Sequence, residues 1–234
     1  MTPQILLMTR PRDASERFVA RLSQAARDAL DVMYAPLLEI VPSGIPIDLA
    51  PDSTVIFTSG NGVRLAPAGS GRAAFCVGRR TAENAQHRGW DVLHVAENAD
   101  ALVAVLSADF RPRRATHLAG THRRGEIAAR LAAHGWQVDV AELYEQRLRP
   151  LRPEAKTLLS GEAPVILPLF SPRTAAHLSR QIDALTNTQV IALSGAVSGA
   201  LSKGLSEHVH VVQAPTGDMM AQYVEMRALG IRSA

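Results

Sequence analysis

The sequence is poor in cysteine and in aromatic residues, and it has no long apolar run. Its one cysteine, Cys76, excludes an internal disulfide and any metal site made of several thiolates, and its apolar neighbours predict a buried thiol. No apolar run approaches the roughly 18 to 20 residues that a membrane helix needs. The first residues become charged too soon for a secretion signal, so we expect a cytoplasmic protein without membrane contact.

Lysine is also scarce. Only Lys156 and Lys203 are lysines among the 25 basic residues, which leaves 23 arginines. A guanidinium group can bind a carboxylate or phosphate through two parallel hydrogen bonds, so one interpretation is a polyanionic ligand. A genome that favours arginine codons explains the same composition equally well. No arginine-rich run is interleaved with aromatic residues, and the eight histidines do not cluster at metal-ligand spacing, so we expect neither nucleic acid nor metal.

Short apolar runs alternate with helical stretches along almost the whole chain. The expected strands are residues 4–8, 29–34, 54–57, 73–77, 91–95, 115–118, 137–141, 164–167, 189–193 and 208–212. The expected helices are residues 13–27, 81–88, 100–107, 124–134, 173–181 and 218–227. Repeated alternation of strand and helix predicts an α/β fold with parallel sheets flanked by helices.

The chain also contains an internal repeat. Residues 55–63 (VIFTSGNGV) match residues 167–175 (LPLFSPRTA) as a strand that runs into a serine-led turn. A second kind of unit, made of strand, turn, helix and strand, ends on Tyr34 near the start of the chain and on Tyr144 in the middle. The two kinds of unit therefore alternate twice along the chain. The general similarity of all strand–helix units is the alternative explanation.

Several short motifs together resemble the uroporphyrinogen-III synthase family, in that family's order and spacing and over nearly the whole chain. They are LLMTRP at 6–11, IFTSGNGV at 56–63, VGRRTA at 77–82, HLAG at 117–120, VAELYEQ at 140–146 and LFSPRTA at 169–175. Each motif alone is weak, and the set is fairly specific. Departures from the family pattern occur in the short segment 60–72, which is broken by proline and glycine, and in the turn after residue 120.

The resemblance implies two similar lobes, each a parallel sheet flanked by helices, joined by a linker of two segments. Residues 1–36 and 151–234 would form lobe 1, residues 46–141 lobe 2, and residues 37–45 and 142–150 the linkers. Both linker segments have proline punctuation and an extended character, which suits a crossing between lobes.

The resemblance also implies an activity. Such an enzyme cyclises hydroxymethylbilane, a linear tetrapyrrole with eight carboxylates, to uroporphyrinogen III, with loss of water and inversion of the last pyrrole ring. It is a lyase that uses no cofactor. We expect a monomer, and direct transfer of the substrate from hydroxymethylbilane synthase is left open.

Tyr144 is the first catalytic candidate, because it matches the family's tyrosine and a phenol can give a proton to a departing hydroxyl. Thr81 is the second, as a hydrogen-bond donor to the substrate. The candidates for substrate binding lie in the turns after the strands, where backbone N–H groups attract carboxylates. They are Arg10, Ser59, Gly60, Asn61, Gly78, Arg79, Gly120, Thr121, Ser171, Ser194, Gly195 and Ser198.

Each assignment has a plain structural alternative. Tyr144 can be an aromatic residue packed against a linker, and Ser59, Thr81 and Ser171 can be helix caps, a role compatible with substrate binding. The arginines can be solvated surface residues. At the level of function, the alternative is an inactive homologue that closes two lobes over a tetrapyrrole or small anion without chemistry.

Overall fold

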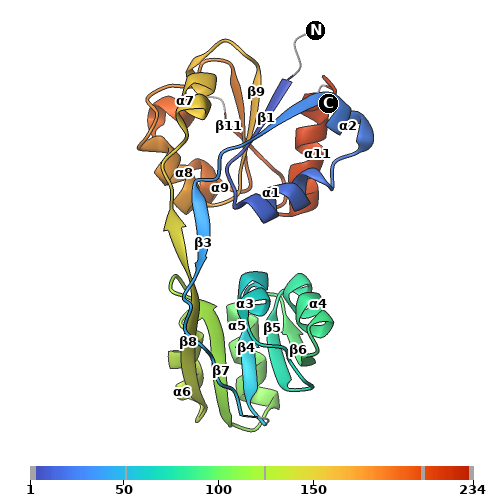
Figure 1. Ribbon diagram of the computed structural model, residues 1–234, viewed down its shortest axis with the longest axis vertical. Helices are drawn as coiled ribbons and strands as arrows, with labels where there is room; N and C mark the ends of the chain where they lie inside the picture. Colours follow the sequence, from blue (N-terminus) through green and yellow to red (C-terminus); the bar gives the residue numbers. More distant parts are fainter. Residues whose placement is uncertain (1–3, 51, 124, 207–208, 232–234) are drawn as a thin grey trace. The chain divides into compact units, whose positions relative to one another are not determined.

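The computed structural model describes residues 4–231, except 51, 124, 207 and 208. Its chain divides into two units, shown in Figure 1: unit 1 comprises Met1–Glu39 and Arg147–Ala234, and unit 2 comprises Ile40–Gln146. The chain passes from unit 1 to unit 2 within strand β3 (Leu38–Pro42) and returns within strand β8 (Gln137–Leu148). Unit 1 is therefore discontinuous in sequence, and unit 2 is inserted into it.

Unit 1 has a five-stranded sheet in the order β11-β10-β9-β1-β2, in which all neighbouring strands are parallel. Its strands are β1 (Gln4–Met8), β2 (Leu30–Tyr34), β9 (Val165–Leu169), β10 (Thr188–Ala192) and β11 (Val209–Val211). Successive side chains of a strand point to opposite faces, so Leu7 joins one apolar core and Leu6 and Met8 join the other.

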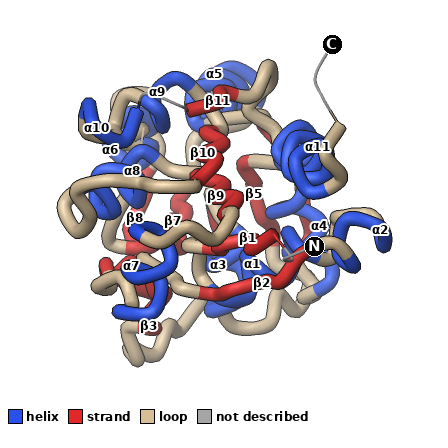
Figure 2. The backbone as a smooth tube through the Cα atoms, turned by 90° about the horizontal axis from the view of Figure 1, so that it is seen from above, coloured by secondary structure: helices blue, strands red, loops and turns tan. Residues whose placement is uncertain are grey.

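Helices cover both faces of this sheet. They are α1 (Arg12–Val19), α2 (Gln24–Asp28), α7 (Pro153–Ser160), α8 (Pro172–Ser179), α9 (Gly195–Ser198), α10 (Lys203–Ser206) and α11 (Gly217–Ala228). Phe18 of α1 and Met220 of α11 belong to the core of one face, whereas Ala155 of α7 and Ala175 of α8 belong to the core of the other. Figure 2 shows α8 and α11 on opposite sides of β9 and β10.

Unit 2 repeats this architecture in a six-stranded sheet of order β3-β8-β7-β4-β5-β6. Its remaining elements are β4 (Thr54–Phe57), α3 (Gly60–Leu65), β5 (Ala73–Val77), α4 (Arg79–His87), β6 (Asp91–Ala96), α5 (Ala99–Asp109), β7 (Arg114–Gly120) and α6 (Ile127–Ala132). Val63 of α3 and Ala82 of α4 pack on one face, and Leu102 of α5 and Leu131 of α6 pack on the other. The β4–α3 and β5–α4 units thus cover the face opposite to α5 and α6.

The two sheets have the same strand order once the added edge strand β3 is set aside. Unit 1 reads β2-β1-β9-β10-β11 and unit 2 reads β8-β7-β4-β5-β6, so β1 corresponds to β7 and β9 corresponds to β4. The repeat seen in the sequence matches these pairs, with residues 55–63 over β4 and residues 167–175 over β9. The predicted α/β class with parallel sheets flanked by helices is confirmed.

Two of the differences between the local predictions and the structure have a clear physical cause. The helix expected over residues 13–27 is interrupted, because Ser23 caps a new helix by accepting a hydrogen bond from the Ala26 N–H at 3.3 Å. The strand expected over residues 137–141 continues to Leu148, because its edge is paired with β3. Cys76 is buried, as predicted, and burial raises the pKa of its thiol to about 12. Residues 124 and 208, at the start of an expected helix and strand, lie outside the described residues.

Candidate functional site

The candidate site of unit 2 lies at the carboxyl ends of its two central strands, β4 and β7. These strands are neighbours in the sheet, yet the helices that follow them pack on opposite faces, α3 on one and α6 on the other. In open α/β sheets, ligands bind at such a switch point, outside the carboxyl ends of the strands. Thr58 and Ser59 follow β4, whereas Gly120 ends β7 and Thr121 follows it.

Two hydroxyl groups meet at this point. The Ser59 Oγ and Tyr144 Oη atoms are 2.8 Å apart, within hydrogen-bond distance, although the residues are far apart in sequence. Ser59 also caps α3 by accepting a hydrogen bond from the Gly62 N–H at 3.2 Å. The capping role and the contact with Tyr144 therefore coexist. Since Ser59 Oγ already accepts one hydrogen bond, its own O–H is able to donate to the phenol oxygen, leaving the phenol proton for another acceptor.

Gly120 determines where the ring of Tyr144 lies. Gly120 is the register partner of Tyr144 across β7 and β8, next to an irregularity in the pairing. A Cβ atom on Gly120 would lie 2.5 Å from Cε2 and 2.7 Å from Cζ of the Tyr144 ring. The ring thus occupies the space that a side chain would fill, and Tyr144 is only 3% exposed. The Thr121 N–H donates to the Tyr144 carbonyl at 3.0 Å, which ties the turn after β7 to β8.

A second, partly buried polar pair lies beside the first, and no prediction from the sequence included it as a site. The Nε2 atom of His117, on β7, is 3.2 Å from the Thr58 Oγ1 atom. His117 is 2% exposed, and burial, with a smaller contribution from the Arg123 charge, lowers its pKa from 6.5 to about 4. The imidazole is therefore neutral near pH 7. In the sequence, the only sign of a functional role for His117 is its position in the HLAG segment. The spacing between His117 and His122 indicates only that they do not form a metal site.

Because His117 stays neutral in the folded state, we expect unit 2 to lose stability on acidification. An exposed histidine in the unfolded chain binds a proton below about pH 6.5, whereas folded His117 does so only near pH 4. The stabilisation is fully present above pH 6.5 and declines toward pH 4, by about 3 kcal/mol in total. Denaturant unfolding at several pH values measures this decline.

The matched variants are His117→Gln, which keeps a hydrogen-bonding group but does not titrate, and His134→Gln, which changes an exposed histidine of the same unit. His117→Gln is expected to flatten the decline between pH 6.5 and 4, and His134→Gln to leave it as it is. An unaltered decline in His117→Gln would show that other groups cause the acid sensitivity.

The other predicted residues of unit 2 lie at the same edge, just before or within the first turns of helices α3 and α4. Gly78 has a left-handed backbone (φ of +84°) and precedes α4, with Arg79 exposed as the first helical residue. Thr81 is buried inside the first turn of α4 rather than at the cap, so its interpretation as a helix cap is wrong. Gly60 and Asn61 are the first, half-buried residues of α3.

The remaining predicted residues belong to unit 1 and lie at the corresponding edge of its own sheet. Arg10 follows β1, and its guanidinium carbon is 4.2 Å from the centroid of the Phe170 ring. Ser171 and Ser194 are at the N-terminal cap positions of α8 and α9, but neither side chain makes a capping hydrogen bond. Gly195 is exposed, and Ser198 is the last residue of α9.

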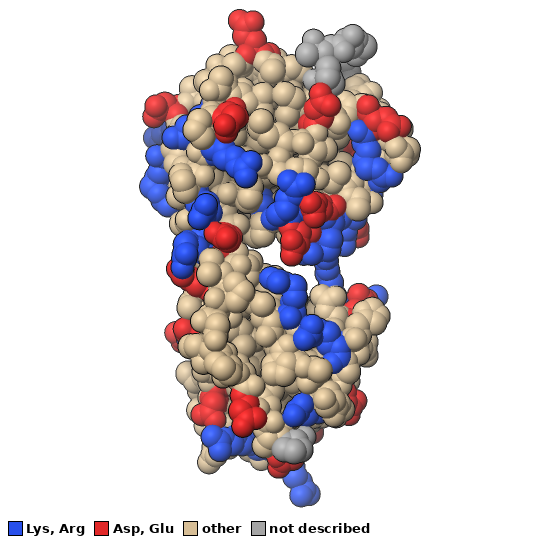
Figure 3. Space-filling view, viewed as in Figure 1, with Lys and Arg blue, Asp and Glu red and all other residues tan. Residues whose placement is uncertain are grey.

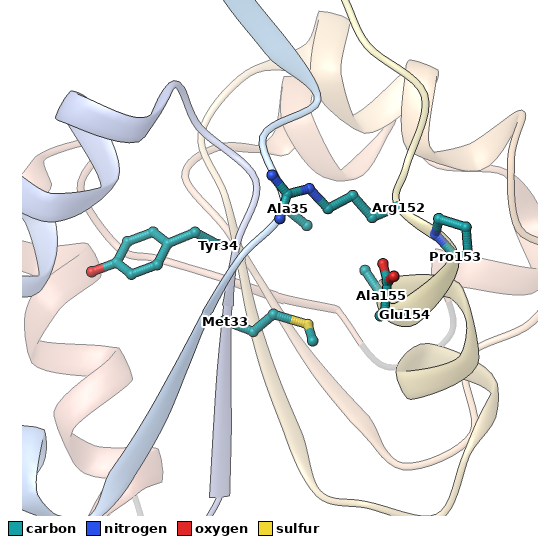
Figure 4. Close-up of a pocket in the computed structure, with 7 residues that line it drawn as sticks. All are labelled: Met33, Tyr34, Ala35, Arg152, Pro153, Glu154 and Ala155. Carbon is teal, nitrogen blue, oxygen red and sulfur yellow. The ribbon is translucent and has the colours of Figure 1, made fainter.

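Unit 1 also has a pocket that the sequence did not reveal. It has a volume of about 370 Å³ and lies between the end of β2 and the start of α7, lined by residues 33–35 and 152–155. In Figure 4 the Met33 side chain extends toward the start of α7, while the Tyr34 ring points away. The pocket results from packing between segments far apart in sequence, and no predicted site residue lines it.

Charge is unevenly distributed on the visible face of each unit. In Figure 3, basic side chains of unit 1 lie among acidic ones along the edge that carries α1, whereas the α3 and α4 side of unit 2 shows basic side chains within an uncharged surface. In the described part of the chain, no three or more His, Cys, Asp or Glu side chains come together as metal ligands. No helix among the described residues has both the length and the apolar character needed to span a membrane.

Fold and site together define a class of two-unit α/β proteins, in which one architecture occurs twice and polar turns gather at the carboxyl ends of parallel strands. The family described as "Uroporphyrinogen-III synthase HemD" has a model that matches residues 17–222. The chain therefore belongs to the uroporphyrinogen-III synthase family, whose enzymes are cyclising lyases of heme biosynthesis. Its substrate is a small molecule.

Solved structures agree on the fold. The crystal structure of uroporphyrinogen-III synthetase from Helicobacter pylori 26695 aligns with 98% of this chain and 100% of its own, with a TM-score of 0.64 and 17% identity. A mutant uroporphyrinogen III synthase from the extremely thermophilic bacterium Thermus thermophilus aligns over 98% and 100%, with a TM-score of 0.55 and 16% identity. At these identities the likeness establishes the fold alone. No curated protein sequence matches the chain.

Proposed function

We propose that this chain converts hydroxymethylbilane to uroporphyrinogen III, with Tyr144 as the proton donor to the departing hydroxyl. The observation that carries the assignment is the 2.8 Å contact between Tyr144 Oη and Ser59 Oγ at the switch point of unit 2. The family match supplies the reaction, and this contact supplies a group able to begin it.

The proposed chemistry balances without a further reactant. The phenol O–H of Tyr144 gives its proton to the hydroxyl, the carbon–oxygen bond breaks, and water leaves. Ser59 donates a hydrogen bond to the phenol oxygen as negative charge develops there, and the Gly62 N–H polarises Ser59 in turn. The proton released when the macrocycle regains its pyrrole aromaticity restores the phenol.

The glycine and hydroxyl turns have a positioning role in this proposal. A flexible linear tetrapyrrole must be held folded before its ends can react, and holding reactants together provides a large part of the barrier reduction in such reactions. Gly60 and Asn61 are half-buried at the same edge of the sheet as Ser59, and as the first residues of α3 they carry N–H groups that are suited to carboxylates. The N–H groups of Gly78 and Thr121 already donate to the Ala96 and Tyr144 carbonyls, so these two residues are proposed to line the site rather than to donate from the backbone. Thr81 is proposed as a hydrogen-bonding partner of the substrate in the same turn as Gly78.

Exchange of Ser59 tests the proposal. We expect Ser59→Ala to lower kcat for hydroxymethylbilane about tenfold, because the phenol oxygen loses its hydrogen-bond donor, and to cost about 1 kcal/mol of stability through the lost cap. Asn98→Ala is the matched control, since Asn98 caps α5 of the same unit by accepting from the Ala101 N–H at 2.9 Å.

The control separates capping from chemistry. Asn98→Ala should lose similar stability in denaturant unfolding and keep full turnover. Equal turnover in both variants and in the unaltered chain would remove the hydroxyl pair from the mechanism. A chain that binds the tetrapyrrole without any turnover would instead support the inactive binding module.

The finer properties of the enzyme stay predictions from the sequence. These are a cytoplasmic location, a monomeric state and function without metal or cofactor, whereas direct receipt of substrate from hydroxymethylbilane synthase stays open. The assignment of residues 37–45 and 142–150 as inter-lobe linkers belongs to the same group.

A further inference from the structure

The internal repeat places two tyrosines at equivalent positions, but their surroundings differ. Tyr34 pairs in register with Met8, as Tyr144 pairs with Gly120. Gly120 leaves room for the Tyr144 ring, which is buried above it. Met8 has a side chain that is fully buried, and the Tyr34 ring is half-buried instead. The same position of the repeat therefore presents a hydroxyl to a serine in unit 2 and an aromatic face in unit 1.

That aromatic face is covered by an arginine. The guanidinium carbon of Arg12, the first residue of α1, lies 3.8 Å from the centroid of the Tyr34 ring. Arg10, two residues earlier, lies over Phe170 in the same manner at 4.2 Å. We name these four residues, Arg10, Arg12, Tyr34 and Phe170, the stacked arginine platform. It lies at the carboxyl ends of β1, β2 and β9, where ligands of such sheets bind.

Stacking fixes the plane of a guanidinium group while its edges stay available for hydrogen bonds. The Nε of Arg12 donates to Glu16 Oε1 at 2.5 Å. Among the described residues, no acceptor takes a hydrogen bond from the two terminal amino groups of Arg12, and the side chain is 58% exposed. An oriented guanidinium with its outer edge open to solvent is suited to a planar anion, and a carboxylate fits it through two parallel bonds.

We propose that the stacked arginine platform binds carboxylates of the substrate, with Arg12 as a binding residue and Tyr34 as its support. This inference rests on the proposed function, because that function supplies a ligand rich in carboxylates. It assigns different tasks to the two copies of the repeat: unit 2 carries the hydroxyl pair, and unit 1 carries the carboxylate platform.

Binding of two stable porphyrins tests the proposal without catalysis. Uroporphyrin I has eight carboxylates and coproporphyrin I has four, and titration of the full chain followed by porphyrin fluorescence gives both Kd values. We expect Arg12→Ala to weaken uroporphyrin binding about 5- to 10-fold, with a smaller effect on coproporphyrin, because a charge-assisted contact to a carboxylate is lost. Arg17→Ala removes the same charge from an exposed position of the same helix. It should bind uroporphyrin more tightly than coproporphyrin, as we expect of the unaltered chain.

Variants of Tyr34 test the support. Tyr34→Leu should weaken uroporphyrin binding as Arg12→Ala does. Tyr34→Phe keeps the aromatic face, so its affinity for uroporphyrin should equal that of the unaltered chain. Three results would each overturn the platform. Arg12→Ala could bind uroporphyrin as tightly as the unaltered chain does, or Arg17→Ala could lose as much affinity as Arg12→Ala. The unaltered chain could also bind uroporphyrin no more tightly than coproporphyrin. Turnover of hydroxymethylbilane by the unaltered chain is measured in parallel, so loss of the proposed function is distinguished from loss of the platform alone.

Discussion

Exchange of Tyr144 for phenylalanine is expected to lower kcat about 100-fold or more, which is the usual contribution of a well-placed general acid. The ring is held by Gly120 and by the core that includes Phe57 and Leu118, and phenylalanine fills the same volume. Only the hydroxyl and its 2.8 Å contact with Ser59 Oγ are removed. Stability should therefore change by no more than about 1 kcal/mol, the worth of one hydrogen bond.

Tyr223→Phe provides the control for this variant. Tyr223 is 8% exposed and lies in unit 1, where its ring packs against His210. Removal of its hydroxyl should leave kcat unchanged. Single-turnover measurements with hydroxymethylbilane, combined with circular dichroism to verify folding, decide the matter. A folded Tyr144→Phe enzyme with wild-type turnover would exclude the phenol as the proton donor.

Addition of one methyl group at Gly120 should have the second large effect. The new Cβ would lie 2.5 Å from Cε2 of Tyr144, closer than real Cβ contacts, so the ring must move. Because the ring is buried, the change should destabilise unit 2 by about 1 to 3 kcal/mol, the usual cost of overpacking a core. The displaced hydroxyl would lose its contact with Ser59, and kcat should fall at least tenfold.

Two comparisons make the Gly120→Ala experiment specific. Gly204→Ala is the control, since the nearest atom to its new Cβ is 3.6 Å away, an ordinary contact. The double variant Gly120→Ala with Tyr144→Phe should lose no more turnover than Tyr144→Phe alone, because both changes act through one hydroxyl. Additive losses in the double variant would show that Gly120 acts on the substrate by another route.

Much of the fold could be predicted because it depends on local patterns. The apolar runs that became β4 and β9 are buried along their whole length, and β1 is buried over Leu6, Leu7 and Met8. Each run ends at a polar turn, as expected for central strands of parallel sheets. The break at Ser23 and the extension of β8 could not be predicted in the same way. The break depends on whether the Ser23 side chain accepts a hydrogen bond from the Ala26 N–H, and the extension depends on pairing with β3, a strand far away in sequence.

The candidate site was predictable only in part, for a related reason. Motif resemblance identified Ser59, Gly120 and Tyr144, but not that the glycine accommodates the tyrosine ring or that the two hydroxyls touch. The pair of His117 and Thr58 was missed because a buried histidine with one hydroxyl partner has no distinctive spacing. Arg12 was also missed, because its position depends on the ring of Tyr34, which lies on strand β2 and has no fixed sequence spacing from it.

The central claim is that this chain directs the cyclisation of hydroxymethylbilane to one isomer, and the product itself tests it most directly. Freshly prepared hydroxymethylbilane is supplied to the purified chain with and without a metal chelator, and the uroporphyrin isomers are separated after oxidation. The account predicts that type III dominates over type I under both conditions. Type I alone, the product of spontaneous closure, would contradict it.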